Sequence, residues 1–88
     1  MRVRGRKPVD PANELRRLRV AAGLTQLEAA IAMGRTPGMI GAWEANRSVP
    51  EMKMVPIIAR AYRTSTDAVM GAMLGVTKRM KPRASAVA

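Results

Sequence analysis

Apolar residues recur at helical spacing along the chain, and residues that favour helix starts precede each repeat. Leu15 and Leu18 lie three positions apart, on one face of a helix. The Asp-Pro pair at 10–11 is a typical helix start, with Asp as the N-cap and Pro in the first turn. Gly23 is a typical residue just beyond a helix end. The pattern predicts a helix over residues 11–22.

Two short helices joined by a tight turn are predicted next. Residues 25–33 begin with Thr-Gln-Leu-Glu, which has the spacing of a capping box, and Gly34 permits a sharp turn. Residues 36–45 begin with Thr-Pro, which repeats the helix-start signal, and Asn46 suits the left-handed conformation that ends a helix. The side chains expected in the core are Ala29, Ala30, Met33, Ile40 and Trp43.

Two further helices complete an all-α pattern of five short helices without strands. The fourth covers residues 51–62, and Pro56 interrupts it. Either the helix is kinked there, or a loose first turn precedes a helix that begins near Pro56. Its apolar face is predicted to hold Met52, Val55, Ile58, Ala59 and Tyr62. The fifth begins after Ser65 and ends at Gly75, with an apolar face of Val69, Met70, Met73 and Leu74.

Charge divides the 88 residues into three parts. The net charge is +10, yet residues 10–75 contribute only two of these positive charges. Residues 1–9 form a basic arm and residues 76–88 a basic, disordered tail, with four lysines or arginines each. Two cationic ends flanking a nearly balanced domain suit a polyanion, of which nucleic acid is the commonest. The alternative is that both ends are merely solvated.

Composition argues against several other classes of protein. The chain has no Cys and no His, which removes the usual general base and the commonest zinc ligands. Its six carboxylates are scattered, and no Gly-rich phosphate loop is present. No apolar run reaches the roughly 18 residues of a membrane span. We therefore expect a cytoplasmic, nucleoid-associated protein that is not an enzyme and needs no metal or cofactor.

The basic arm contains the segment RGRKP, residues 4–8, which resembles an AT-hook core with one lysine inserted. In such a segment the glycine allows close approach to the minor-groove floor. Arg4 and Arg6 would then reach along a narrow, electronegative A·T groove. A generic phosphate-binding arm is the alternative interpretation.

Residues 16–70 resemble the lambda-repressor/Cro-like helix-turn-helix domain, also called the xenobiotic-response-element family. The matching segments are LRRLRVAAGLTQ (15–26), Ala30, Gly34, Ile40 with Trp43-Glu44, and PEMKMVPIIARAYRTSTDAVM (50–70). The resemblance implies a five-helix bundle that binds double-stranded DNA. It also implies that Gln26, Thr36 and Arg47 contact the DNA backbone. Arg19 and Glu44 match a structural ion pair that ties the first helix to the third.

The base-reading positions depart from this family. Pro37, Gly38 and Ala42 stand where the family usually has polar side chains that bond to base edges. The remaining candidates are Arg35, just before the helix, and apolar contacts of Pro37, Met39 or Ala42 with thymine methyl groups. We therefore expect weaker sequence specificity than in a typical repressor.

Leu27 and Ile31 lie four positions apart, where the family is usually polar. Either they fill the core around the small Ala29, or they form an exposed apolar patch with Met39 that binds a protein. By resemblance, a homodimer would use the region after the fourth helix. The candidate residues there are Val69, Met73 and Leu74.

Three functions fit these features. The first is a DNA-binding transcriptional regulator, a phage or bacterial repressor that occupies an operator as a dimer. The second is a nucleoid-type architectural protein with little sequence specificity, favoured by the apolar third helix and the cationic ends. The third is an antitoxin-like module that binds a protein partner through Leu27, Ile31 and Met39.

Overall fold

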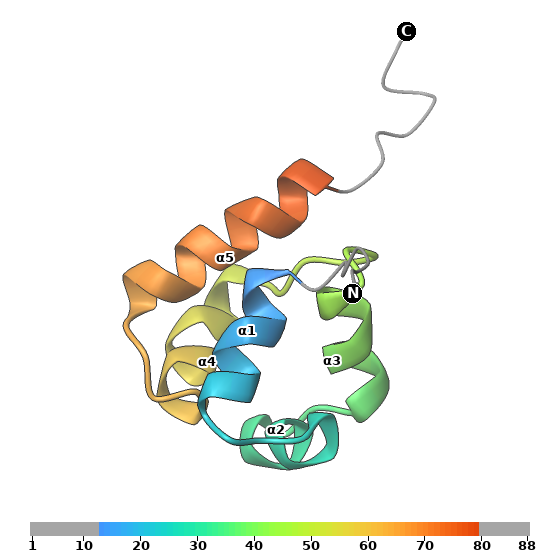
Figure 1. Ribbon diagram of the computed structural model, residues 1–88, viewed down its shortest axis with the longest axis vertical. Helices are drawn as coiled ribbons and strands as arrows, with labels where there is room; N and C mark the ends of the chain where they lie inside the picture. The colour runs from blue at the N-terminus through green and yellow to red at the C-terminus, as the bar shows by residue number, and fades with distance from the viewer. Residues whose placement is uncertain (1–12, 80–88) are drawn as a thin grey trace, which may run out of the picture.

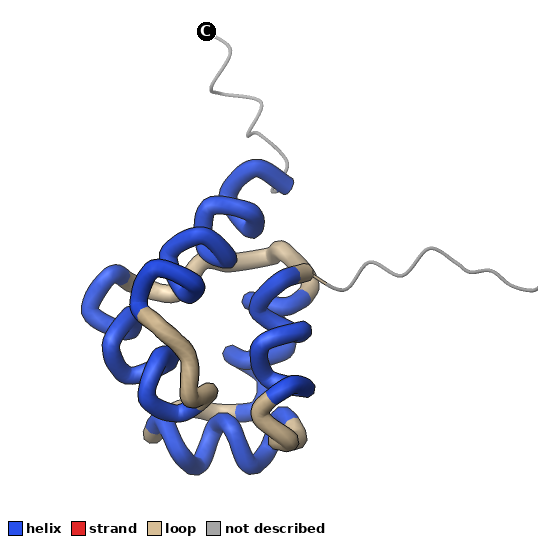
Figure 2. The backbone as a smooth tube through the Cα atoms, turned by 60° about the vertical axis from the view of Figure 1, so that its left-hand side comes forward, coloured by secondary structure: helices blue, strands red, loops and turns tan. Residues whose placement is uncertain are grey.

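The computed structural model describes residues 13–79, and every regular element in that range is helical (Figures 1 and 2). The elements are α1 (Glu14–Ala21), α2 (Gln26–Met33), α3 (Pro37–Glu44), the 3₁₀ helix η1 (Met52–Met54), α4 (Val55–Ala61) and α5 (Thr66–Arg79). The predicted all-α fold of five helices is thereby confirmed.

The helices surround one apolar core. Helix α2 packs against α3 and α4, and α5 packs against α1 and α4. Helix α1 also contacts α3, so α1 links the two halves of the bundle (Figure 1). The core side chains are Leu15, Ala29, Ala30, Met33, Ile40, Trp43, Met54, Val55, Ile58, Ala59, Tyr62, Val69, Ala72, Met73 and Val76.

The signals predicted at the ends of α2 and α3 are formed. In α2 the Thr25 hydroxyl accepts a hydrogen bond from the Glu28 amide at 3.0 Å, and the Glu28 carboxylate accepts one from the Thr25 amide at 2.8 Å. Helix α2 ends at Gly34, whose φ is +70°, and Asn46 after α3 has φ +61°. These conformations reverse the chain at the helix ends predicted from the sequence.

The predicted start of the first helix was wrong. Asn13 has an extended backbone and is the N-cap of α1, its side chain accepting from the Arg16 amide at 3.1 Å. The same side chain donates to the Trp43 carbonyl at 2.8 Å and to Asn46 Oδ1 at 3.0 Å. These contacts with the end of α3 favour a cap at Asn13 over the Asp-Pro signal, whose residues lie outside the described range.

The fourth helix follows the second of the two predicted alternatives. A 3₁₀ turn, η1, precedes α4, which begins at Val55 and has Pro56 in its first turn. The tighter turn rotates the side chains relative to an α-helix. Met54 is therefore buried and Met52 is 64% exposed, which corrects the prediction that Met52 belongs to the core.

The fifth helix is longer than predicted. Helix α5 continues through Gly75 to Arg79, and Val76 is fully buried, so residues 76–79 are not part of a disordered tail. Burying a valine side chain stabilises by about 1.5 kcal/mol or more, which offsets the roughly 1 kcal/mol that a helical glycine costs. Met70 and Leu74, predicted to lie on the apolar face of this helix, are 42% and 63% exposed.

Two glycine-to-alanine variants separate these backbone effects. Gly71 lies within α5 with open space where a Cβ would be, whereas Gly34 has a left-handed φ. We expect Gly71→Ala to raise the free energy of unfolding by about 1 kcal/mol and Gly34→Ala to lower it by about 1 kcal/mol. Denaturant unfolding measures both, and changes of the same sign would contradict the assignment.

Candidate nucleic-acid interface

Helices α2 and α3 and the turn between them form the part of the fold that the sequence predicts to contact DNA. Both helices have eight residues, and each begins with a threonine cap. Thr36 is exposed, and its hydroxyl accepts a hydrogen bond from the Met39 amide at 3.2 Å. Pro37 and Gly38 complete an exposed first turn of α3. Amide groups at such helix starts favour anions such as phosphate.

A buried ion pair joins the end of α1 to the end of α3. The Nε and Nη2 atoms of Arg19 donate to the two carboxylate oxygens of Glu44, at 2.7 and 3.1 Å. Arg19 Nη1 also donates to the Leu24 carbonyl at 2.8 Å. The Arg19 and Glu44 side chains are only 10% and 5% exposed. This bidentate contact fixes the relative position of the two helices.

Gln26, the first residue of α2, joins the same network. Its Nε2 atom donates to Glu44 Oε1 at 3.1 Å, and its side chain is half-buried. The sequence indicated a phosphate contact for Gln26 but not this bond to Glu44. No local pattern reveals the bond, because the two residues lie 18 positions apart.

The network raises the pKa values of Arg19 and Tyr62. The hydrogen bond to Glu44 raises the pKa of Arg19, so the guanidinium stays charged. Burial, reinforced by the Glu44 charge, raises the pKa of Tyr62 to about 12, so this phenol stays neutral. Arg19 is therefore charged and Tyr62 neutral at neutral pH.

The outer face of α3 carries small side chains. Gly38 is exposed, whereas Gly41 and Ala42 are half-buried. A Cβ atom at Gly38 or Gly41 would meet no atom closer than 3.7 Å, so packing requires neither glycine. The fold has room for a Cβ atom at both positions, so packing does not explain why the outer face of α3 lacks side chains there.

Arg35 and Met39 lie beside the segment that precedes α4. Arg35 is half-buried, and its guanidinium donates to the Gly34 carbonyl at 3.3 Å and to Met54 Sδ at 3.2 Å. Both residues line a hollow between the start of α3 and the segment that precedes α4. In this arrangement the Arg35 side chain is directed along the protein surface towards Met54.

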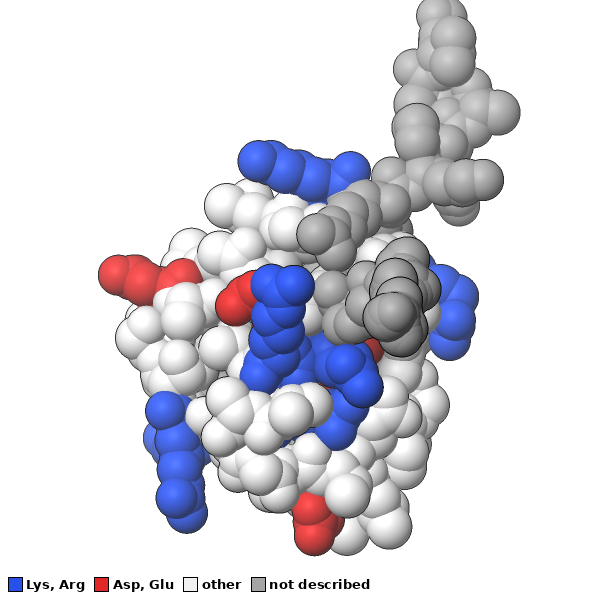
Figure 3. Space-filling model, viewed as in Figure 1, with Lys and Arg blue, Asp and Glu red and all other residues white. Residues whose placement is uncertain are grey.

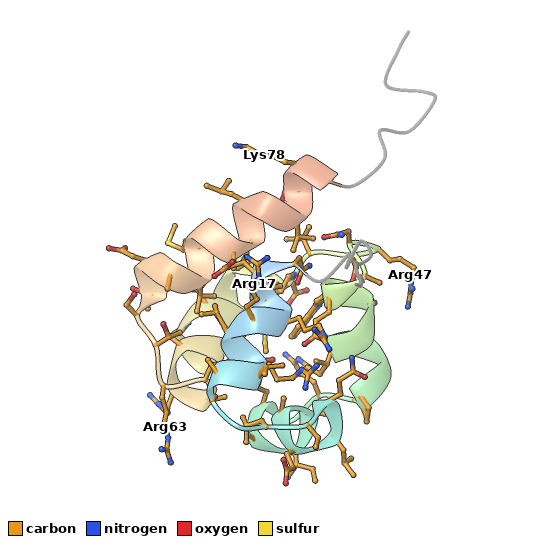
Figure 4. All side chains as sticks on the ribbon, in the orientation of Figure 1. Arg17, Arg47, Arg63 and Lys78 are labelled. Carbon is orange, nitrogen blue, oxygen red and sulfur yellow. The ribbon has the colours of Figure 1, made fainter. Side chains whose placement is uncertain are left out.

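Exposed cations are spread over several sides of the described domain. Figure 4 shows Arg47 projecting from the end of α3, Arg63 below α4 and Lys78 near the end of α5. Arg17 on α1 forms an exposed ion pair with Glu14 at 3.1 Å. In Figure 3 several basic side chains gather near the centre of the visible face, and others occupy separate points towards its edges. Arg47 is thus the exposed cation placed beside the end of α3.

Arg4 and Arg6 of the predicted arm lie outside the described residues. Within residues 13–79, no helix is long and apolar enough to span a membrane.

The family model for a helix-turn-helix domain matches residues 12–70. The chain belongs to the helix-turn-helix domain family. This membership is consistent with the lambda-repressor/Cro-like resemblance and indicates DNA binding. Comparisons with curated proteins and with solved structures found no significant match.

Helix α2 exposes two large apolar side chains. Leu27 and Ile31 on α2 are 57% and 71% exposed, so the interpretation that they fill the core was wrong. Met39 on α3 is 42% exposed and lines the hollow next to Arg35. Among the proposed dimer residues, Val69 and Met73 are buried in the core, which leaves Leu74 exposed.

The buried pair makes a strong prediction about stability. Arg19→Met leaves the Glu44 carboxylate buried without its partner, and we expect the free energy of unfolding to fall by about 3–5 kcal/mol. Arg17→Met breaks the exposed pair with Glu14 and serves as the matched control, with an expected loss below about 1 kcal/mol. Equal losses in denaturant unfolding would contradict this assignment.

Proposed function

We propose that this protein is a transcriptional repressor of phage or bacterial type that occupies operator DNA as a homodimer. It acts sterically and without catalysis, by excluding polymerase from the occupied site in the cytoplasm. The observation that supports this proposal most strongly is the helix-turn-helix family match over residues 12–70. In a dimer the two α3 helices would enter successive major grooves about 34 Å apart.

Contacts to phosphate supply most of the proposed binding energy. The first turns of α2 and α3 offer amide groups, with Gln26 and Thr36 at their starts. Arg47 is exposed beyond the end of α3. The basic arm, with Arg4 and Arg6, and the basic residues after position 76 add charge. Such contacts position a protein on DNA without reading its sequence.

Base recognition is expected to be limited. Pro37, Gly38 and Ala42 on α3 have no side-chain donor or acceptor, so they cannot make the bidentate bonds that distinguish bases. Pro37, Met39 and Ala42 can contact thymine methyl groups. Because Arg35 already bonds to Gly34, it must change rotamer to reach a base. This bare face favours the second candidate function, an architectural DNA-binding protein that uses the same fold.

Helix α5 provides the proposed dimer surface. Met70 and Leu74 are exposed on it, beside an apolar groove between α5 and residues 49–52. In a twofold dimer the same patch serves both subunits. The α2 patch of Leu27 and Ile31 is the alternative surface, and its occupant would be a different protein.

Binding-site selection from random DNA tests the proposed function. We expect the full chain to select a defined motif, and removal of residues 1–9 to weaken its A·T preference. Enrichment for A·T content alone would favour the architectural role. In gel shifts, log K should fall with log salt concentration by about 0.9 for each phosphate neutralised. An affinity that does not change with salt would contradict DNA binding by either route.

Two matched variants test the dimer surface. Leu74→Asp places a charge on the exposed face of α5, whereas Leu27→Asp places one on α2. Burying an unpaired carboxylate is costly, so the charge disrupts whichever face is the interface. We expect Leu74→Asp to give monomers in sedimentation and Leu27→Asp to leave the dimer intact. If only Leu27→Asp dissociated the dimer, the dimer interface would lie on α2 instead.

A further inference from the structure

We propose that Glu44 is a positioning residue for DNA binding, which holds the Gln26 carboxamide so that an N–H group faces a DNA phosphate. This inference rests on the proposed DNA-binding function. It extends the role of Glu44 beyond the ion pair with Arg19. The bond that carries it runs from Gln26 Nε2 to Glu44 Oε1, at 3.1 Å.

The chemistry of the bond determines which end of the carboxamide faces Glu44. An ionised carboxylate accepts hydrogen bonds and donates none, so the Nε2 end of Gln26 must point towards it. Nε2 carries two N–H groups, of which this bond uses one. The second N–H remains for a phosphate oxygen. Without the carboxylate, the oxygen and nitrogen ends of the carboxamide could exchange places.

The Glu44 carboxylate is itself held by other contacts. Arg19 binds both of its carboxylate oxygens, and Arg19 is in turn held by the Leu24 carbonyl just before α2. The Glu44 side chain is 5% exposed, whereas Gln26 is only half-buried. A rigid buried acceptor therefore orients a side chain that still reaches the surface.

The carboxamide lies between the two helices of the motif. A Cβ atom at Gly41, in the middle of α3, would lie 3.7 Å from Gln26 Oε1 and 3.8 Å from Nε2. Gln26 thus extends from the first turn of α2 to the bare face of α3. The Gln26 carboxamide is therefore a polar group beside a face of α3 that has few polar side chains.

The charge of Glu44 and its proposed orienting role predict opposite changes in DNA affinity when Glu44 is replaced. A carboxylate repels DNA, so Glu44→Gln should strengthen binding if the charge acts only through its field. If Glu44 orients Gln26, the same substitution should weaken binding. The sign of the change in affinity therefore separates the two effects.

The experiment compares Gln26→Met, Glu44→Gln and the double variant of the full chain, using DNA selected by the wild-type protein. We expect each single variant to bind about tenfold more weakly, the loss of one hydrogen bond to a charged group. The double variant should lose no more than either single variant. The salt dependence should stay unchanged, because a neutral carboxamide releases no counterion. Glu51→Gln removes an exposed carboxylate as the control, and its affinity should not fall.

Tighter binding by Glu44→Gln, or additive losses in the double variant, would overturn the inference. Failure of the wild-type protein to bind any DNA would instead overturn the proposed function. Thermal unfolding shows whether each variant is folded at the temperature of the assay. If Glu44→Gln does not fold, NMR of the wild-type Gln26 side-chain amide gives the test. Its N–H signals should shift when DNA is added, and unchanged signals would contradict a phosphate contact.

Discussion

The buried pair of Arg19 and Glu44 is the contact on which the arrangement of the DNA-binding helices depends. It joins α1 to α3, and Gln26 adds α2 to the same carboxylate. Charges this far from solvent tolerate little displacement, because a broken contact leaves a buried charge unpaired. Asn13 provides a second tie, from the start of α1 to the Trp43 carbonyl. The angle between α2 and α3 is therefore fixed by side chains from outside the motif as well as by the turn at Gly34.

Helix α3 depends on this support more than its neighbours do. It contains Pro37, Gly38 and Gly41, and glycine costs a helix about 1 kcal/mol relative to alanine. Neither glycine is required by packing or by a left-handed backbone. Burial of Ile40 and Trp43 and the bonds to Glu44 hold the helix in place. Helix α3 is thus held in place by tertiary contacts but has few polar side chains on its outer face. This favours the proposal that neighbouring groups such as Gln26 and Arg47 contact the DNA.

Helices α2 and α5 expose large apolar side chains. Leu74 on α5 and Leu27 and Ile31 on α2 are large apolar side chains exposed on separate helices. Exposed apolar side chains of this size are a usual mark of a protein contact when they lie together. Helix α5 also borders the apolar groove next to residues 49–52. Because the exposed side chains of α5 continue into this groove, the proposed dimer contact is assigned to α5, and α2 is the alternative surface.

The sequence by itself determined the features that depend on neighbouring residues. Helix caps, the turn at Gly34 and the apolar stripes involve residues three or four positions apart, and they were sufficient to predict five helices. The family was inferred from the resemblance of residues 16–70. Tertiary structure decided the rest. It moved the N-cap of α1 to Asn13, extended α5 past Gly75 and left Leu27 exposed. Each of these outcomes, like the bond from Gln26 to Glu44, depends on which distant helix lies alongside. Local spacing carries no signal for that arrangement.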